Sequence, residues 1–365
     1  MVIGGFMLIS KRVERFQNIP EKPDRAILDF SSEESSEAAP GLVRNFTKRS
    51  IDKRRHFGNN QDDSEFSETV MKWIQNRFNV ILDKNQICCT SGLNDSILNL
   101  SHCFLDQEDI TLVPSPCNPQ INNIGFYSKI HFLPLLKENQ YYPNLELLDE
   151  IKKKAKIMWI NYPNNPTTQM ASKEFLKKII DFGHDNNILI VSDESFSETY
   201  FEDAPLSILQ LSTDGVVAIN SPCKRSSMDG YNIGWIAGDI NIIDIIRKFR
   251  MHMKLNVPMF LQDAAIAAYS DEKHVELMRE NYKIKRNTIC NALKDAGYEV
   301  DYPTASPFIW LESNNTFKKI QVKNGEDLGQ EINGFNPGKG CIRISLYPSI
   351  PNCKTFADII RANPL

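Results

Sequence analysis

The sequence contains a series of short, continuously apolar runs, and each run ends in a turn of polar residues. Clear examples are IMWINYPNNP, ILIVSDES and VVAINSPCK, and a segment of helical spacing, SKEFLKKIIDFGHDNN with Ser172 as its expected N-cap, lies between the first two. A strand that is apolar on both faces must be buried on both faces, and strands that alternate with helices are typical of a covered parallel sheet. We therefore predict an α/β fold, with functional residues in the turns at the carboxyl ends of its strands.

The length of 365 residues favours one large α/β unit and a smaller second one. We expect an N-terminal arm and part of the small domain in residues 1–45, the large domain in 46–255, and an interdomain helix with the C-terminal small domain in 256–365. The apolar spacing also predicts a helix over residues 66–78, one long or two joined helices after residue 256, and a closing helix near 354–361.

Composition and charge disfavour several classes of function. The formal net charge is −4, and basic residues are scattered among acidic ones, so we expect no nucleic-acid partner. The eight cysteines include no C-x-x-C pair and no Cys/His cluster with zinc spacing, so we expect reduced thiols and no metal site. No apolar run has membrane length, and the opening residues place an apolar patch before basic residues, the reverse of a signal peptide. We therefore expect a cytoplasmic protein without membrane association.

Five polar segments follow or lie within the predicted strands. They are TSGLND (90–95), NYPNNPTT (161–168), SDES (192–195), SPCKRSSMDGYNIGW (221–235) and CIRIS (341–345). In this order and separation they resemble the fold-type-I aminotransferases, which depend on pyridoxal 5′-phosphate (PLP). They resemble most the histidinol-phosphate aminotransferase and threonine-phosphate decarboxylase branch, and the segment ILDFSS (27–32) also resembles the start of that branch. The resemblance implies a mostly parallel seven-stranded sheet flanked by helices, a smaller α+β domain, an amino acid substrate and a homodimer.

The resemblance also implies a role for each matching residue. Lys224 matches the lysine whose amine forms a Schiff base with PLP and then acts as general base, and Asp193 matches the aspartate on the pyridine nitrogen. Asn165 matches the asparagine on the ring oxygen, and Arg343 matches the arginine that binds the substrate carboxylate through two parallel hydrogen bonds. Each has a plainer reading: a surface lysine, a turn cap, an Asn-Pro turn and a surface strand arginine.

The cofactor phosphate requires backbone N–H groups at a helix start and hydroxyl donors. Gly92, Leu93 and Asn94 occupy the matching turn, where Asn94 or Asp95 is the expected helix cap, and Ser221 precedes the lysine by three positions as in the family. An ordinary helix cap would have the same residues.

The sequence departs from the family at the cofactor. Asn232 stands where the family has a phosphate-binding arginine, and Phe196 stands where it has a tyrosine that donates to the ring oxygen. Asn118 is the nearest match to the aromatic residue that stacks on the ring, and Phe57 stands near the position of a partner-subunit tyrosine. Arg225, next to the lysine, is a candidate replacement for the lost phosphate cation.

Transamination is the activity that the resemblance implies, in amino acid metabolism and biosynthesis. The departures keep other PLP reactions open, namely decarboxylation, elimination, cyclisation and oxidation, as well as a non-catalytic dimeric homologue. Retention of Lys224 together with Asp193 favours an active enzyme. Glu33 and Glu34 lie in the segment that lines the substrate entrance in related enzymes, which admits a basic substrate, although a solvated acidic loop is the simpler interpretation.

Overall fold

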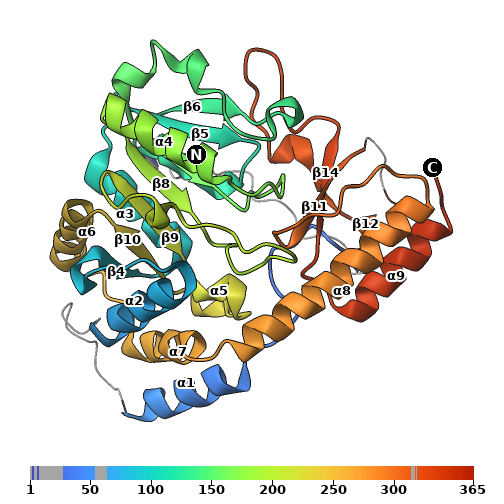
Figure 1. Cartoon of the computed structure of the whole chain (residues 1–365), viewed down its shortest axis with the longest axis horizontal. Helices are drawn as coiled ribbons and strands as arrows, with labels where there is room; N and C mark the ends of the chain where they lie inside the picture. The colour runs from blue at the N-terminus through green and yellow to red at the C-terminus, as the bar shows by residue number, and fades with distance from the viewer. Residues whose placement is uncertain (1, 4–5, 8–27, 54–63, 314–316, 318) are drawn as a thin grey trace.

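The computed structural model of the protein describes residues 2–3, 6–7, 28–53, 64–313, 317 and 319–365. Its largest unit is a seven-stranded sheet between helices (Figure 1). The strand order is β4 (Ile87–Thr90), β10 (Gly234–Gly238), β9 (Val216–Asn220), β8 (Leu189–Asp193), β7 (Ala155–Asn161), β5 (Ile110–Ser115) and β6 (Lys129–Pro134). Strand β10 is antiparallel to both its neighbours and the other pairs are parallel, which confirms the predicted α/β fold with a mostly parallel seven-stranded sheet.

Helices cover this sheet on both faces. They are α2 (Ser64–Phe78), α3 (Gly92–Phe104), α4 (Lys173–Asn186), α6 (Ile240–Met253) and α7 (Met259–Tyr269), and α1 (Gly41–Lys53) packs on α7. Val216 and Ala218 of β9 pack in the core that includes α2, α4 and α7, whereas Val217 and Ile219 pack in the core that includes α3 and α6. Because successive side chains of a strand point to opposite faces, a continuously apolar strand fits a sheet covered twice.

The C-terminal part forms a second, separate core. It contains β11 (Phe308–Glu312), β14 (Cys341–Ser345) and β13 (Lys323–Asn324) in one sheet, β12 (Ile320–Gln321) paired with β3 (Leu28–Asp29), and the packed helices α8 (Lys273–Asp295) and α9 (Ile350–Arg361). Figure 1 shows α8 running from the large sheet to this small unit. The pairing of β3 with β12 brings the chain that follows residue 29 from the small unit towards the large sheet.

Local sequence explains several helix boundaries. Ser172 caps α4 as predicted, since its hydroxyl accepts the Phe175 N–H at 3.1 Å. The predicted cap at Asn94 or Asp95 is wrong: α3 begins at Gly92, and the Asp95 carboxylate instead accepts the Ser91 N–H at 2.8 Å. Short helical elements complete the chain: α5 (Pro222–Arg225), η2 (Lys84–Gln86), η3 (Pro119–Phe126), η4 (Lys137–Asn139), η5 (Leu145–Leu148), η6 (Lys152–Lys154), η7 (Ile208–Gln210), η8 (Asp229–Tyr231) and η9 (Gly325–Asp327), with the hairpin of β1 (Val2–Ile3) and β2 (Phe6–Met7).

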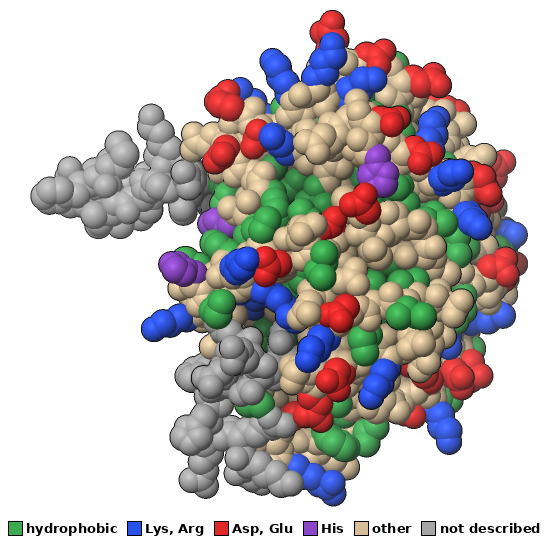
Figure 2. Space-filling model, turned by 60° about the vertical axis from the view of Figure 1, so that its left-hand side comes forward, with side chains coloured by type: hydrophobic (Ala, Val, Ile, Leu, Met, Phe, Trp, Pro, Cys, Tyr) green, Lys and Arg blue, Asp and Glu red, His purple; other side chains and the backbone are tan. Residues whose placement is uncertain are grey.

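The surface carries charges of both signs. Figure 2 shows acidic and basic side chains interspersed over one face of the molecule, between smaller apolar areas. Within the described ranges, no helix is both long enough and apolar enough to span a lipid bilayer.

Candidate active site

A cavity of about 610 Å³ lies at the carboxyl edge of the large sheet. The turns that follow β4, β5, β7, β8 and β9 supply most of its wall, and the segment 31–34 and strand β14 close it from the small unit. Apart from the candidates Arg225 and Phe57, the residues predicted for the site all line this one cavity: Gly92, Leu93, Asn94, Asn118, Asn165, Asp193, Phe196, Ser221, Lys224, Asn232 and Arg343. The carboxyl ends of parallel strands meet at one edge, which explains why turns that are distant in sequence converge here.

Lys224 presents its amine to the cavity rather than to bulk solvent. It lies on the short helix α5 directly after β9, and Ser221 caps this helix by accepting the Cys223 N–H at 3.1 Å. The Lys224 Nζ donates to the Asp229 carboxylate at 2.6 Å and to the backbone oxygen of Glu33 at 2.7 Å. Its side chain is 21% exposed, so the surface-lysine interpretation does not hold.

Asp193 ends β8 with its carboxylate buried. Its Oδ1 accepts the N–H of Ser195 at 3.0 Å and the Ser195 hydroxyl at 2.5 Å. Among the residues that the structure describes, no hydrogen bond reaches Oδ2. Burial raises the pKa of Asp193 to about 6, although the two hydrogen bonds from Ser195 lower it. A buried carboxylate with one free oxygen fits the protonated pyridine nitrogen of PLP, because that cation would stabilise its charged form.

Arg343 is buried, with 2% of its side chain exposed, so it is no surface strand arginine. Its Nη1 donates to the Glu33 carboxylate and, at 2.8 Å, to the Asn165 side-chain oxygen, and its Nη2 donates to the Ser31 oxygen at 3.0 Å. The guanidinium carbon lies 4.2 Å from the centre of the Phe308 ring. The Nε of this side chain is buried and has no hydrogen-bond partner among the described residues.

Asn165 and Glu33 belong to the same hydrogen-bonded group. The Asn165 side-chain nitrogen donates to the Glu33 carboxylate at 3.3 Å, and the Asn165 N–H is held by the Asn161 side-chain oxygen at 2.9 Å. Burial raises the pKa of Glu33, but the charge and hydrogen bond of Arg343 and the charge of Lys224 outweigh burial, so the net pKa is lowered. The Glu33 carboxylate is therefore ionised at neutral pH.

The end of the cavity beside α3 is neutral. Gly92 begins this helix with φ +81°, and a Cβ there would collide with the Asn232 side-chain oxygen. The Ser221 hydroxyl donates to the Ile233 oxygen at 2.5 Å. Backbone N–H groups of a helix start with a neighbouring hydroxyl fit a phosphate, and the helix dipole adds to the attraction. The residues that line this end therefore offer the PLP phosphate donors but no charged side chain.

Arg225 does not replace the missing phosphate arginine. It is buried, points to α7 and α8, and donates to both oxygens of Glu272 at 2.7 Å and to the Ala268 oxygen at 3.0 Å. Its guanidinium also lies over the Trp73 and Tyr269 rings. The hypothesis failed because adjacency to Lys224 in sequence says nothing about direction: within one helical turn, neighbouring side chains point to different sides.

The other departures have plain structural roles. The Asn118 side chain accepts the Gln120 N–H at 3.1 Å and so caps η3, and the Phe196 ring packs edge-on against Phe308 with 5.6 Å between centres. Phe57 lies outside the described residues. Asp229, which holds Lys224, was missed by the sequence reasoning, because an Asp in a Gly/Tyr turn carries no motif that marks it.

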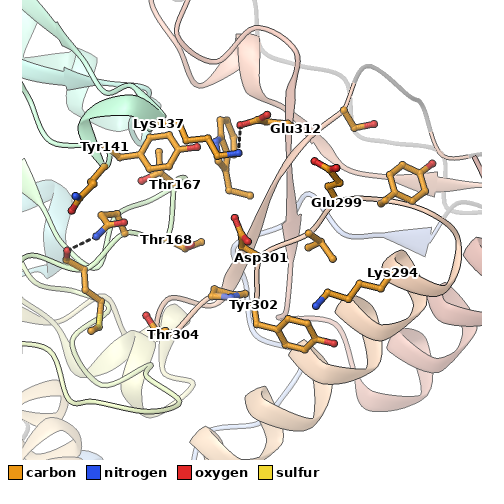
Figure 3. Close-up of a pocket in the computed structure, with 18 of the residues that line it drawn as sticks. Lys137, Tyr141, Thr167, Thr168, Lys294, Glu299, Asp301, Tyr302, Thr304 and Glu312 are labelled. Carbon is orange, nitrogen blue, oxygen red and sulfur yellow. Dashed lines mark hydrogen bonds and ion pairs between the residues drawn. The ribbon is translucent and has the colours of Figure 1, made fainter.

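A second, larger cavity of about 1310 Å³ lies between the two units and contains none of the predicted site residues. Figure 3 shows side chains of the large unit, such as Lys137 and Tyr141, facing Glu299, Asp301 and Tyr302 of the C-terminal unit across it. The Lys137 ammonium and the Glu312 carboxylate form an ion pair at 2.9 Å (Figure 3). This second cavity therefore lies between the two units, and Lys224 does not line it.

The fold and the converging lysine, aspartate and arginine define the class of fold-type-I PLP enzymes. The chain belongs to the aminotransferase class I and II family, whose model matches residues 27–360. It is therefore a PLP-dependent aminotransferase that acts on an amino acid.

The chain is similar to LL-diaminopimelate aminotransferases. The LL-diaminopimelate aminotransferase of Dehalococcoides mccartyi (strain BAV1) is 32% identical over 295 residues, which are 76% of each chain. That of Aquifex aeolicus (strain VF5) is 32% identical over 296 residues, covering 77% of this chain and 76% of the relative. These relatives correct the expected nearer likeness to the histidinol-phosphate branch.

Solved structures share the fold. Substrate-bound BacF from Bacillus subtilis superposes with a TM-score of 0.86 at 24% identity and covers 93% of this chain and 91% of its own. An aspartate aminotransferase from Thermotoga maritima gives a TM-score of 0.85 at 22% identity, with 97% and 99% covered. At this identity the likeness supports the fold alone.

Proposed function

We propose that this aminotransferase uses Lys224 as its cofactor lysine and general base and takes a diamino dicarboxylic acid of the diaminopimelate type as its amino donor. The observation that supports the assignment is one cavity in which Lys224, Asp193 and Arg343 converge. The substrate class is supported by the curated relatives, whose names specify LL-diaminopimelate.

Each residue has a defined part in this reaction. Arg343 binds the substrate α-carboxylate, because its fork can donate two parallel hydrogen bonds in a buried site. Bound PLP supplies an electron sink that acidifies the substrate Cα proton. Lys224 would accept that proton as general base and return it as general acid. Asp229, 2.6 Å from the Lys224 amine, holds the amine in place.

The remaining site residues hold the cofactor. Asp193 would pair through its free Oδ2 with the ring nitrogen, and Asn165 would face the ring oxygen. The N–H groups of Gly92, Leu93 and Asn94 would donate to the phosphate, and the Ser221 hydroxyl would do so once its proton turns away from the Ile233 oxygen. Asn118, Phe196 and Asn232 also line the cavity, as residues that replace the family's aromatic, tyrosine and arginine.

Charged residues at the cavity rim support a substrate with charges at both ends. Glu34 and Lys323 line the cavity together with Arg343. The distal ammonium of a diaminopimelate-type substrate would face Glu34, and its distal carboxylate would face Lys323. A monocarboxylic amino acid would leave both rim charges without a partner from the ligand.

The assembly and domain division belong to the same proposal. The family resemblance supports a homodimer in the cytoplasm. It also supports the division into an arm (1–45), a large domain (46–255) and a connecting and small domain (256–365). Separate cores support this division, although α7 packs in the core of the large sheet, so the connection begins at α8.

The experiment is a donor screen of the PLP-loaded protein. LL-diaminopimelate, aspartate, histidinol phosphate and an aromatic amino acid are each incubated with a panel of 2-oxo acids, and amino acid formation is measured. We expect the highest kcat/KM with LL-diaminopimelate, and a loss of at least about 10²-fold in Arg343→Gln, which lacks the bidentate cation. A higher kcat/KM with histidinol phosphate would overturn the substrate proposal.

A further inference from the structure

Glu33 contacts both ends of the proposed reaction site. It lies in the acidic loop (Ser31–Glu37), which crosses from the small unit over the cavity. Its side-chain carboxylate accepts hydrogen bonds from Arg343 and from Asn165, and its backbone oxygen accepts one from Lys224 at 2.7 Å. Glu33 therefore contacts both Arg343, which is proposed to bind the substrate carboxylate, and Lys224, which is proposed to hold the cofactor.

Burial explains why Arg343 needs such a partner. A guanidinium that is 2% exposed has lost most of its water, and a buried charge without a counter-charge is strongly unfavourable. When no substrate is bound, the Glu33 carboxylate is the acidic side chain that the structure places against Arg343.

The Glu33 carboxylate takes only part of the hydrogen-bonding capacity of Arg343. Glu33 accepts from Nη1 alone, Nη2 is directed to the Ser31 oxygen, and the buried Nε has no hydrogen-bond partner in the described part of the chain. A free carboxylate can accept two parallel hydrogen bonds from one edge of a guanidinium, which is a stronger arrangement. A substrate carboxylate can therefore displace Glu33 from this site.

The acidic loop is anchored on both sides of Glu33. On one side the Phe30 N–H donates to the Gln321 oxygen at 2.7 Å, and on the other the Ser36 hydroxyl donates to the Tyr347 oxygen at 2.8 Å. Displacement of Glu33 therefore requires movement of only the few residues between these anchors.

We propose that Glu33 is an intramolecular competitor for the substrate carboxylate, and that it sets the carboxylate affinity of the Arg343 site by occupying that site in the absence of ligand. The proposal rests on the function proposed above. The measured affinity of a carboxylate is then its intrinsic affinity reduced by the fraction of molecules in which Arg343 is free. This factor is the same for every carboxylate that binds Arg343, so the competition lowers all of their affinities by the same ratio.

The test measures binding of maleate, an unreactive dicarboxylate, to the PLP-loaded protein by isothermal titration calorimetry. We expect Glu33→Gln to lower the dissociation constant about tenfold, since a neutral amide replaces one charge-assisted bond to Arg343. The amide in Glu33→Gln could still accept a hydrogen bond from Arg343. Glu33→Ala removes that bond as well, and it should also lower the dissociation constant. With the proposed amino donor, KM should fall while kcat is unchanged.

Glu37→Gln is the matched control. Glu37 lies at the end of the same acidic loop with its side chain exposed, carries the same charge and does not line the cavity. We expect its maleate affinity to equal that of the wild type, which separates the contact from the general charge of the loop. Unchanged or weaker maleate binding in both Glu33 variants would overturn the competitor role.

Arg343→Gln distinguishes the two proposals. If this variant loses maleate binding while the Glu33 variants equal the wild type, the carboxylate site stands and the competition fails. If Arg343→Gln binds maleate as well as the wild type does, the carboxylate role of Arg343 fails, and with it the function proposed for this site.

Discussion

Asp193 and Glu33 are two carboxylates of the cavity whose surroundings shift their pKa values in opposite directions. Asp193 is buried without a cation, and burial raises its pKa to about 6. Glu33 meets Arg343 and Lys224, whose charges outweigh burial and lower its pKa. In the proposed holoenzyme the protonated ring nitrogen is the cation that Asp193 lacks, so cofactor binding and the charge state of Asp193 are coupled.

The cofactor-free protein should be stabilised by Asp193→Asn. The folded-state pKa of about 6 is raised above the unfolded value, so the folded state binds more protons and stability falls as pH rises from about 4 to 6. At pH 8 the buried charge costs on the order of 3 kcal/mol, which the amide removes. Urea unfolding at pH 5 and pH 8 should show a larger gain at pH 8. An equal gain in the free energy of unfolding at both pH values would contradict the raised pKa of Asp193 in the folded protein.

Helix α3 shows how an element and a site residue depend on each other. Its first residue, Gly92, has a left-handed backbone and approaches Asn232 so closely that a side chain has no room. This places the helix start, with its free N–H groups, against the cavity. Asn232 stands where the family has an arginine, so in the proposed site the cofactor phosphate would rely on backbone donors and the helix dipole.

Gly92→Ala should therefore cost both stability and cofactor affinity. The positive φ and the collision with Asn232 predict a loss of about 1–2 kcal/mol in the free energy of unfolding. Displacement of the helix start should weaken PLP binding, measured by fluorescence titration. Gly41→Ala is the control, since a Cβ there meets no atom within 4 Å. If both variants bind PLP equally well, α3 does not hold the phosphate.

The sequence predicted the helices and strands better than it predicted the contacts of individual side chains. The apolar runs predicted the buried strands, and helical spacing from Phe66 to Phe78 predicted α2 with its buried face. Motif positions predicted the cavity wall, because strand ends of a parallel sheet must converge. The direction of Arg225 and the cap of α3 were wrong. Arg225 turns towards Glu272, which is distant in sequence, so local patterns do not encode its direction. Helix α3 begins two residues before the first predicted cap, and the Asp95 carboxylate bonds to the Ser91 N–H and to Arg250.

At the scale of the molecule, two cores meet around the proposed site. Helix α8 connects them covalently, and the acidic loop connects them at the cavity through Arg343 and Lys224. The second cavity lies between the same two units, and the Lys137–Glu312 ion pair joins its walls (Figure 3). Contacts within each core, rather than this ion pair, should therefore determine global stability.

Lys137→Ala should leave the free energy of unfolding within about 1 kcal/mol of the wild type, because exposed ion pairs contribute little. The Lys137 side chain is 61% exposed and Glu312 is 56% exposed. Chemical denaturation provides the measurement, with Glu138→Ala, a neighbouring variant, as the control. A loss above 2 kcal/mol would show that the pair couples the two units.

The most direct measurement of the central claim is peptide mapping of PLP-treated protein after borohydride reduction. We predict a phosphopyridoxyl group on the peptide that contains Lys224, stoichiometric with the chain, and none on that peptide in Lys224→Ala. Labelling at another lysine, or undiminished stoichiometric labelling in Lys224→Ala, would contradict the account.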